Sequence, residues 1–366
     1  MRNTDAVHIC VLDWLNHRSL NRGNKMNAAN TKNMRKILAR VVILLFFGGA
    51  VYFGYNLYFR MTAKLTVPAA PPAFSVSYLY YFSSGSPLDI VKQNTEVETD
   101  IENIKEAGFE GIKLNFYFRR NNSISDSIAQ AAAKKGLYPI GQLVGHDQKP
   151  KDRAFTDQEL TEWENFVREE VRKNKNLIYY WEIWNEPSMT ELRFRYGTPA
   201  EYLELLKRTQ KIINEENPAA KIIVTVDFTD REAEKFTTEF FDLGGADYFD
   251  YLSFHPYNAI DPKARYDLTQ TINQEKALSE KYNKPLWITE IGVPDANSGE
   301  ARQAEIALAL YETAYENGIP IIWFHWSDRR IPSEDGKTGW GLVRENNTFK
   351  PSYEKIKSFI EECEKK

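Results

Sequence analysis

Cysteine and histidine are scarce in this chain of 366 residues. It contains two cysteines, Cys10 and Cys363, near opposite ends, and five histidines. Two such distant cysteines cannot form a disulfide framework or a cysteine-based zinc site, and no two histidines have the HExxH spacing of a metal-dependent hydrolase. A glycine-rich phosphate-binding fingerprint is also missing after the first predicted strand. We therefore expect neither a metal nor a cofactor.

Composition and charge exclude further classes of protein. Hydrophobic residues make up 42% of the sequence and aromatic residues 13%, and the mean hydropathy is −0.52. These values exclude a disordered chain and a polytopic membrane protein. Residues 1–64 hold 10 Lys/Arg and 2 Asp/Glu, a net charge of +8, whereas the rest of the chain holds 37 and 49, a net charge of −12. A body of that charge is unsuited to nucleic acid, and we expect no such partner.

One long apolar run lies near the N-terminus, at residues 41–59. Its 19 residues carry no charge, and a helix needs about 20 residues to cross a bilayer. Arg35, Lys36 and Arg40 precede it. This excess of positive charge places residues 1–40 in the cytoplasm and the following body outside it. The run therefore predicts a single-pass transmembrane anchor, and residues 60–72, which include three prolines, predict a linker.

Two other interpretations of the apolar run remain open. It could be a signal peptide, because Val67-Pro68-Ala69 resembles a small-residue cleavage site, and the body would then be secreted. It could also be a buried core helix, although no amphipathic face is visible in it. Met34 begins a compact basic segment, and residues 1–33 before it carry no recognisable motif, so Met34 is an alternative start.

The body, residues 73–366, alternates short apolar runs with amphipathic stretches. Such alternation predicts parallel strands with covering helices. The predicted strands are 74–81, 111–117, 137–144, 177–184, 221–227, 251–257, 285–292 and 319–326, and the predicted helices are 91–107, 123–135, 157–173, 199–216, 231–243, 268–282, 300–317 and 352–366. Eight such units predict a (β/α)₈ TIM barrel of the α/β class. A doubly wound open sheet is the alternative fold.

Two glutamates occupy the ends of predicted strands on opposite sides of the ring. The fourth strand ends in the sequence WNEP, which contains Glu186, and the seventh ends in TEIG, which contains Glu290. A TIM barrel places its active groups at these strand ends. Two carboxyl groups that flank one bond are what glycoside cleavage requires, since one protonates the leaving oxygen and the other attacks the anomeric carbon or activates water.

With WNEP and TEIG in this order, the chain resembles the retaining barrel glycosidases of clan A, which include the cellulase-like family 5 and the xylosidase-like family 39. The resemblance spans most of residues 74–350. It implies that Glu186 is the acid/base and Glu290 the nucleophile of a double-displacement reaction.

The same resemblance suggests residues that bind the sugar. Asn185 matches the asparagine that hydrogen-bonds the sugar 2-hydroxyl. His255 and Tyr257 resemble the His-x-Tyr of family 5, in which the tyrosine hydroxyl approaches the nucleophile. A core histidine is the alternative interpretation of His255. Trp326, at the end of the eighth strand, is expected to form the sugar platform, with a non-proline cis peptide bond between it and Ser327.

Some positions differ from the family pattern. Clan members often have an arginine on the second strand, where this chain has Lys113, and family 5 often has a histidine on the third strand, where this chain has Gln142. We include Lys113, Gln142 and Asn115 among the expected substrate-binding residues. Lys113 and Glu182 both occupy positions that face the barrel interior, and they are expected to pair.

Tryptophans are concentrated in the predicted fourth, seventh and eighth strands. Aromatic faces stack on the C–H faces of sugar rings, so tryptophans at the mouth of the barrel suit a glycan-binding groove. Trp181, Trp287 and Trp323 are expected to face the helices instead.

The sequence thus predicts a membrane-anchored, extracytoplasmic retaining β-glycoside hydrolase that acts on an oligo- or polysaccharide. Two alternatives use the same residues. A transglycosylase would transfer the sugar to another sugar instead of to water, and a non-hydrolytic protein would bind the glycan without cleaving it.

Overall fold

The computed structural model describes residues 65–79, 87–145, 149–150, 153–189, 196–226, 231–257, 268–297, 299–330 and 339–365. All of them belong to one of the two compact units of the chain, Phe59–Lys366. The predicted cytoplasmic segment 1–40 and the predicted anchor 41–59 lie outside the described residues. Among the residues that are described, no helix is both long enough and apolar enough to span a bilayer.

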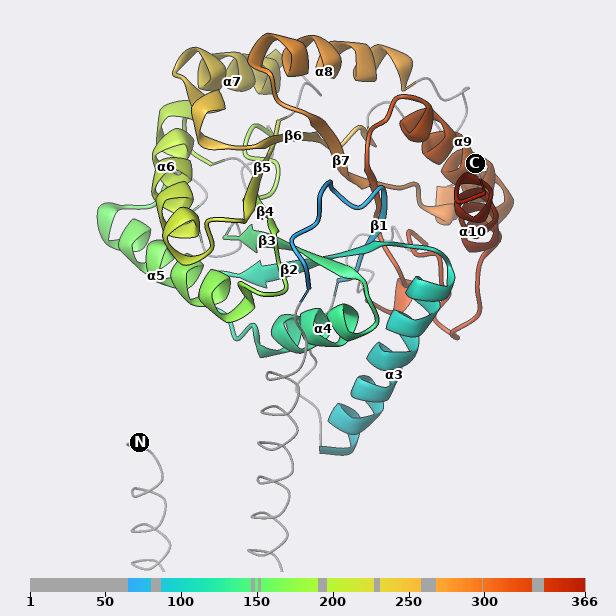
Figure 1. The fold of residues 1–366 in the computed structure, drawn as a ribbon. Coiled ribbons are helices and arrows are strands. Elements are labelled where there is room, and N and C mark those ends of the chain that lie inside the picture. Colours follow the sequence, from blue (N-terminus) through green and yellow to red (C-terminus); the bar gives the residue numbers. More distant parts are fainter. Residues whose placement is uncertain are drawn as a thin grey trace, which may run out of the picture. The chain divides into compact units, whose positions relative to one another are not determined.

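Eight parallel strands close into a barrel in chain order, which confirms the predicted (β/α)₈ fold (Figure 1). The strands are β1 (Phe74–Ser77), β2 (Gly111–Tyr117), β3 (Tyr138–Val144), β4 (Tyr180–Ile183), β5 (Lys221–Thr225), β6 (Tyr251–Phe254), β7 (Leu286–Ile291) and β8 (Ile321–Trp323). Pairing of β1 with β8 closes the ring. Most strands are shorter than predicted, because the chain leaves the sheet where the loops of the mouth begin; β4 and β8 also begin later than predicted, at the opposite end of the barrel.

Helices surround the sheet and connect successive strands (Figure 1). They are α3 (Pro87–Glu106), α4 (Ser123–Lys134), α5 (Asp157–Asn174), α6 (Pro199–Glu216), α7 (Arg231–Asp242), α8 (Thr269–Tyr282), α9 (Glu300–Glu316) and α10 (Pro351–Cys363), with short 3₁₀ helices η2 (Gly245–Tyr248), η4 (Asp295–Asn297) and η5 (Asp328–Arg330). Capping boxes fix the starts of α5 and α6: Thr156 pairs with Glu159, and Thr198 with Glu201. Each box satisfies two backbone N–H groups that have no partner within the helix.

The barrel interior holds a small apolar layer of its own. Trp287 packs edge-on against Tyr180, with ring centroids 5.2 Å apart. It shares a cluster with residues of β3, β5 and β8, and strands so far apart around the ring meet only inside the barrel. The prediction that Trp287 faces the helices is therefore wrong. Trp181 does lie in the outer layer, against Phe116, as does Trp323.

The described chain begins at the N-terminal end of the barrel. The Leu65 backbone N–H donates to the carbonyl of Asn176 (3.0 Å), and the Tyr179 hydroxyl donates to the Leu65 carbonyl (3.1 Å). Asn176 and Tyr179 directly precede β4. The linker thus meets the barrel at the end opposite the strand termini that carry Glu186 and Glu290.

Candidate active site

Glu186 lies just beyond the C-terminal end of β4, in a tight turn. Trp184 and Glu186 both adopt left-handed backbone conformations, with φ of 71° and 47°, which cost about 1–2 kcal/mol for each non-glycine residue. The Gln142 side chain supports this turn, because its Nε2 donates to the Trp184 carbonyl (3.1 Å) and to Asn185 Oδ1 (3.0 Å). Strain held in place at a strand end is typical of functional sites.

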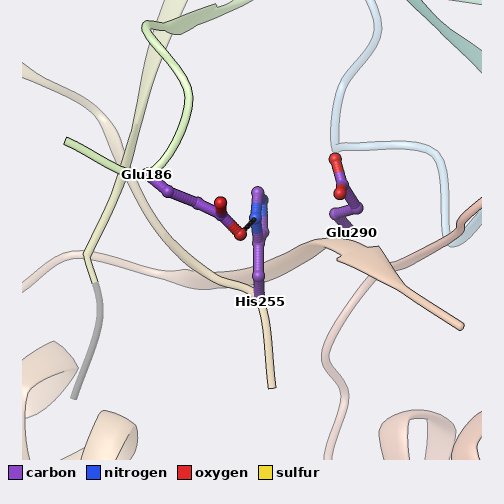
Figure 2. A group of neighbouring side chains, drawn as sticks. All are labelled: Glu186, His255 and Glu290. Carbon is purple, nitrogen blue, oxygen red and sulfur yellow. Dashed lines mark hydrogen bonds and ion pairs between the residues drawn. The ribbon is translucent and has the colours of Figure 1, made fainter. Parts of the chain in front are cut away.

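Glu290 projects from β7 toward the same space (Figure 2). One carboxylate oxygen of Glu186, one of Glu290 and one ring nitrogen of His255 all lie within 4.8 Å of one another. Retaining glycosidases have carboxyl groups about 5–5.5 Å apart, whereas inverting enzymes leave about 6.5–9.5 Å for a water molecule. The oxygen separation therefore fits the shorter arrangement.

One hydrogen-bond donor and one cation hold the carboxylate of Glu290. The Tyr257 hydroxyl donates to Oε1 (2.9 Å), and Lys113 Nζ lies 3.6 Å from Oε2. Burial raises the pKa of Glu290, and the positive charges of His255 and Lys113 oppose that rise. Burial and the neighbouring Glu290 carboxylate also raise the pKa of Tyr257, so this phenol keeps its proton and remains a donor.

Glu186 is held by two different partners. His255 Nδ1 lies 2.9 Å from Glu186 Oε1 (Figure 2), and Asn185 Nδ2 donates to Oε2 (3.2 Å). Burial opposes protonation of His255, but the carboxylates of Glu290, Glu182 and Glu186 outweigh it and raise the pKa of His255 to about 10. His255 is therefore a buried cation between carboxylates at neutral pH.

A buried ion pair lies beneath the two glutamates, inside the barrel. Lys113 Nζ is 2.7 Å from Glu182 Oε2, and both side chains are fully buried, so the predicted pairing is confirmed. Burial raises the pKa of Glu182, but Lys113 and His255 outweigh it and bring the pKa down to about 2. Lys113 has no exposed surface, so the prediction that it binds substrate directly is wrong. It contacts Glu290 from below instead.

The predicted sugar platform is also wrong. Trp326 is fully buried and packs against Tyr353 of α10, with centroids 6.0 Å apart, so it faces the helices. The non-proline cis peptide bond joins Phe324 to His325, two residues before the predicted position. The half-buried side chains of Phe324 and Trp340 lie beside Tyr257 instead.

These two aromatic rings form a wall beside the nucleophile candidate. Trp340 packs edge-on against Tyr257, with centroids 5.5 Å apart, and against Phe324 at 5.9 Å. Sequence alternation missed Phe324 because β8 ends at Trp323, after which the two-residue period no longer fixes direction. The remaining predicted residue, Asn115, is half-buried and donates from Nδ2 to the Tyr117 hydroxyl (3.1 Å).

Within the described part of the chain, Glu186, His255 and Glu290 are the side chains placed closely enough to hold a metal ion. The charges and hydrogen bonds of these three side chains disfavour a bound metal ion. His255 is already charged and bonded to Glu186, and Lys113 supplies a positive charge to Glu290. A metal ligand must present a neutral imidazole and free carboxylate oxygens, so this arrangement suits proton transfer better than coordination.

Comparison with known proteins gives one family match. The family described as Cellulase (glycosyl hydrolase family 5) matches residues 81–330. No curated protein sequence matches the chain significantly.

Several solved structures share the fold. A family 39 glycoside hydrolase from the gut symbiont Bacteroides cellulosilyticus has a TM-score of 0.63 at 20% identity, over 81% of this chain and 64% of that one. GH5_18 from Streptomyces cattleya, in complex with GlcNAc, has a TM-score of 0.59 at 15% identity, over 81% of each chain. The endo-1,4-beta-mannanase from Rhizomucor miehei has a TM-score of 0.59 at 14% identity, over 82% of this chain and 98% of that one. At such identities the likeness shows the fold alone.

Proposed function

Since this chain belongs to glycosyl hydrolase family 5, the cellulase family, we propose that it hydrolyses β-glycosidic bonds of an oligo- or polysaccharide with retention of anomeric configuration. The observation that carries this proposal is the pair of carboxylates on opposite strands, Glu186 and Glu290, with oxygens within 4.8 Å of each other. That spacing suits direct attack by one carboxylate on the sugar, with no room for an intervening water.

In the first step, Glu290 attacks the anomeric carbon while Glu186 donates a proton to the leaving glycosidic oxygen. A covalent glycosyl-enzyme forms and the aglycone departs. In the second step, Glu186 takes a proton from water, which attacks the anomeric carbon and releases Glu290. The net reaction consumes one water molecule per bond.

The surrounding residues support both steps. Tyr257 and Lys113 stabilise the ionised form of Glu290, because each places positive charge or a donated proton against its carboxylate. His255 and Asn185 hold Glu186 from its two oxygens. The clan asparagine that Asn185 matches bonds the sugar 2-hydroxyl, and we propose the same contact for Asn185.

The aromatic wall of Phe324 and Trp340 is the proposed contact for the sugar ring. It stands beside Tyr257 and hence beside Glu290. Sugar C–H faces pack well on aromatic faces, and a half-buried ring retains an exposed face for this purpose.

The test is a screen of the full-length protein on β-linked oligosaccharides, including β-mannans and β-glucans, followed by NMR of the first product. The β anomer should appear before mutarotation, and the Glu290→Ala variant should be inactive on every substrate. An α anomer as first product would refute retention. Products longer than the substrate would instead indicate a transglycosylase, and tight glycan binding without cleavage would indicate a binding protein.

We further propose that residues 41–59 anchor the protein in the membrane with the barrel outside the cytoplasm. The positive charge before this run supports the orientation. The linker at Leu65 meets the barrel at the end opposite the active-site mouth, which leaves the mouth free for a polymer. The full-length protein should sediment with membranes and resist a high-salt wash, whereas a released fragment starting near Ala70 would show that the run is a cleaved signal peptide.

A further inference from the structure

A third buried carboxylate, Glu182, lies under the two glutamates and connects their partners. Its Oε2 is 2.7 Å from Lys113 Nζ, and Lys113 in turn is 3.6 Å from Glu290. Its Oε1 is 3.4 Å from His255 Nε2, and His255 Nδ1 is 2.9 Å from Glu186. Glu182 thus contacts both Lys113, the cation beside Glu290, and His255, the cation beside Glu186, while its own side chain is fully buried.

The barrel surrounds Glu182 on every side. The groups that contact it are Lys113 of β2, Thr225 of β5, His255 after β6 and Thr289 of β7. The phenol of Tyr202 of α6 bonds the neighbouring Ile183 carbonyl, and burial and the charge of Glu182 raise its pKa. Thr225 donates to Oε1 at 2.6 Å, and Thr289 donates to the same oxygen at 3.2 Å. Of these neighbours, Lys113 and His255 form ion pairs with Glu182.

The charged groups around Glu182 leave one net positive charge facing Glu186 and Glu290, because Lys113 and His255 contribute two positive charges and Glu182 one negative charge. An uncompensated charge is very costly in such a buried place. The neutral arrangement is one in which one of the two glutamates is ionised and the other keeps a proton. That is the state in which a retaining glycosidase begins its reaction.

We propose that Glu182 is a positioning residue whose buried negative charge, set against Lys113 and His255, leaves the two catalytic glutamates with one proton between them. This inference rests on the proposed function, because it assigns Glu186 and Glu290 to the acid and the nucleophile. Lys113 and Glu182 act as a unit in this role: the lysine favours an ionised Glu290, and Glu182 offsets one of the two positive charges, so that one proton remains on the pair of glutamates.

The two members of the pair should therefore affect the pH–rate profile in opposite directions. In the Glu182→Gln variant, two positive charges face Glu186 and Glu290, so both glutamates ionise. The basic limb of the plot of kcat/KM against pH should then move to lower pH. In the Lys113→Met variant, no net positive charge faces the two glutamates, so a proton stays on the nucleophile. The acidic limb of the same plot should then move to higher pH. Each shift should be about 1 pH unit or more, as expected for a charge at this range.

The double variant Lys113→Met/Glu182→Gln restores the original charge count, and its optimum should return close to that of the wild type. The matched control is Glu170→Gln, which alters a buried glutamate between α4 and α5 and should leave both limbs in place. All variants are compared on one substrate that the wild type hydrolyses, with folding checked by thermal melting.

A lower kcat in both single variants, with neither limb of the pH–rate profile moved, would overturn the proposal. If Lys113 and Glu182 had only a structural role, their loss would lower the fraction of active protein without changing the protonation of the two catalytic glutamates. If the single variants do not fold, the double variant decides: an optimum displaced by about 1 pH unit or more refutes charge balance, and a wild-type optimum supports it. These outcomes are separate from failure of the proposed function, in which the wild type itself would hydrolyse no β-glycoside.

Discussion

Tyr257→Phe removes a single oxygen atom from the site and thereby tests whether Glu290 is the nucleophile. The Tyr257 hydroxyl donates to Glu290 Oε1 at 2.9 Å, in a pocket where burial already raises the pKa of that carboxyl. A hydrogen bond to a charged group contributes about 1.5–3 kcal/mol. One pKa unit corresponds to about 1.36 kcal/mol, so loss of this bond is worth about 1–2 units.

The sign of the shift follows from which form the bond favours. The hydroxyl stabilises the ionised carboxylate, so its removal raises the pKa of Glu290 further. The nucleophile must be ionised to attack, and the acidic limb of kcat/KM should therefore move to higher pH by about 1–2 units. The basic limb depends on the proton of Glu186, which Tyr257 does not contact, and should stay in place.

The assay is kcat/KM against pH on an aryl β-glycoside from the substrate screen. Tyr311→Phe is the matched control, because Tyr311 is buried in α9 among Phe74 and Phe359, away from the carboxylates. It should leave both limbs unchanged. An acidic limb that stays in place in Tyr257→Phe, or a basic limb that moves instead, would show that Glu290 is not the group titrating there.

Three other variants test separate parts of the site. Glu186→Ala should lose about 10²–10⁴-fold on natural glycosides but keep the first step on substrates with activated leaving groups. Added azide should then restore turnover and give a β-glycosyl azide; equal loss on both substrate types without rescue would remove the acid/base role. Trp340→Ala should raise KM with little change in kcat, and an unchanged KM would exclude ring stacking there. Lys350→Met removes the buried cation shared by Asp295 (2.7 Å) and Asp328 (2.6 Å), and should lower the free energy of unfolding by about 3 kcal/mol in a denaturant titration; a loss below about 1 kcal/mol would mean that the two aspartates are hydrated.

The strand ends that carry Glu186 and Glu290 were predictable from the sequence. Apolar runs of strand length alternate with amphipathic stretches, and this local pattern predicts the element types and a parallel sheet, while the count of eight units favours a closed barrel. The topology then dictates that all strand ends lie at one mouth. Local chemistry also determined helix starts such as that of α6, where Thr198 and Glu201 form a capping box.

Only the tertiary structure decided which side chains face that mouth. Trp326 was predicted to be a platform but is buried against α10, whereas Phe324 packs beside Tyr257, because the two-residue alternation no longer fixes side-chain direction once the chain leaves the sheet. Trp287 was predicted to face the helices but lies inside the barrel. Its strand has a register irregularity between Ile288 and Ile291, which local sequence does not reveal.

The charge network is likewise a property of the closed ring. The sequence placed Lys113 and Glu182 on interior positions of two strands, and from that their pairing could be predicted. It could not determine that His255 and Glu290 complete the network, because these contacts join residues at least 69 positions apart and depend on the radius of the barrel. Sequence therefore determined that the strand ends with Glu186 and Glu290 meet at the mouth, and packing across the ring decided which other side chains surround them and at what distances.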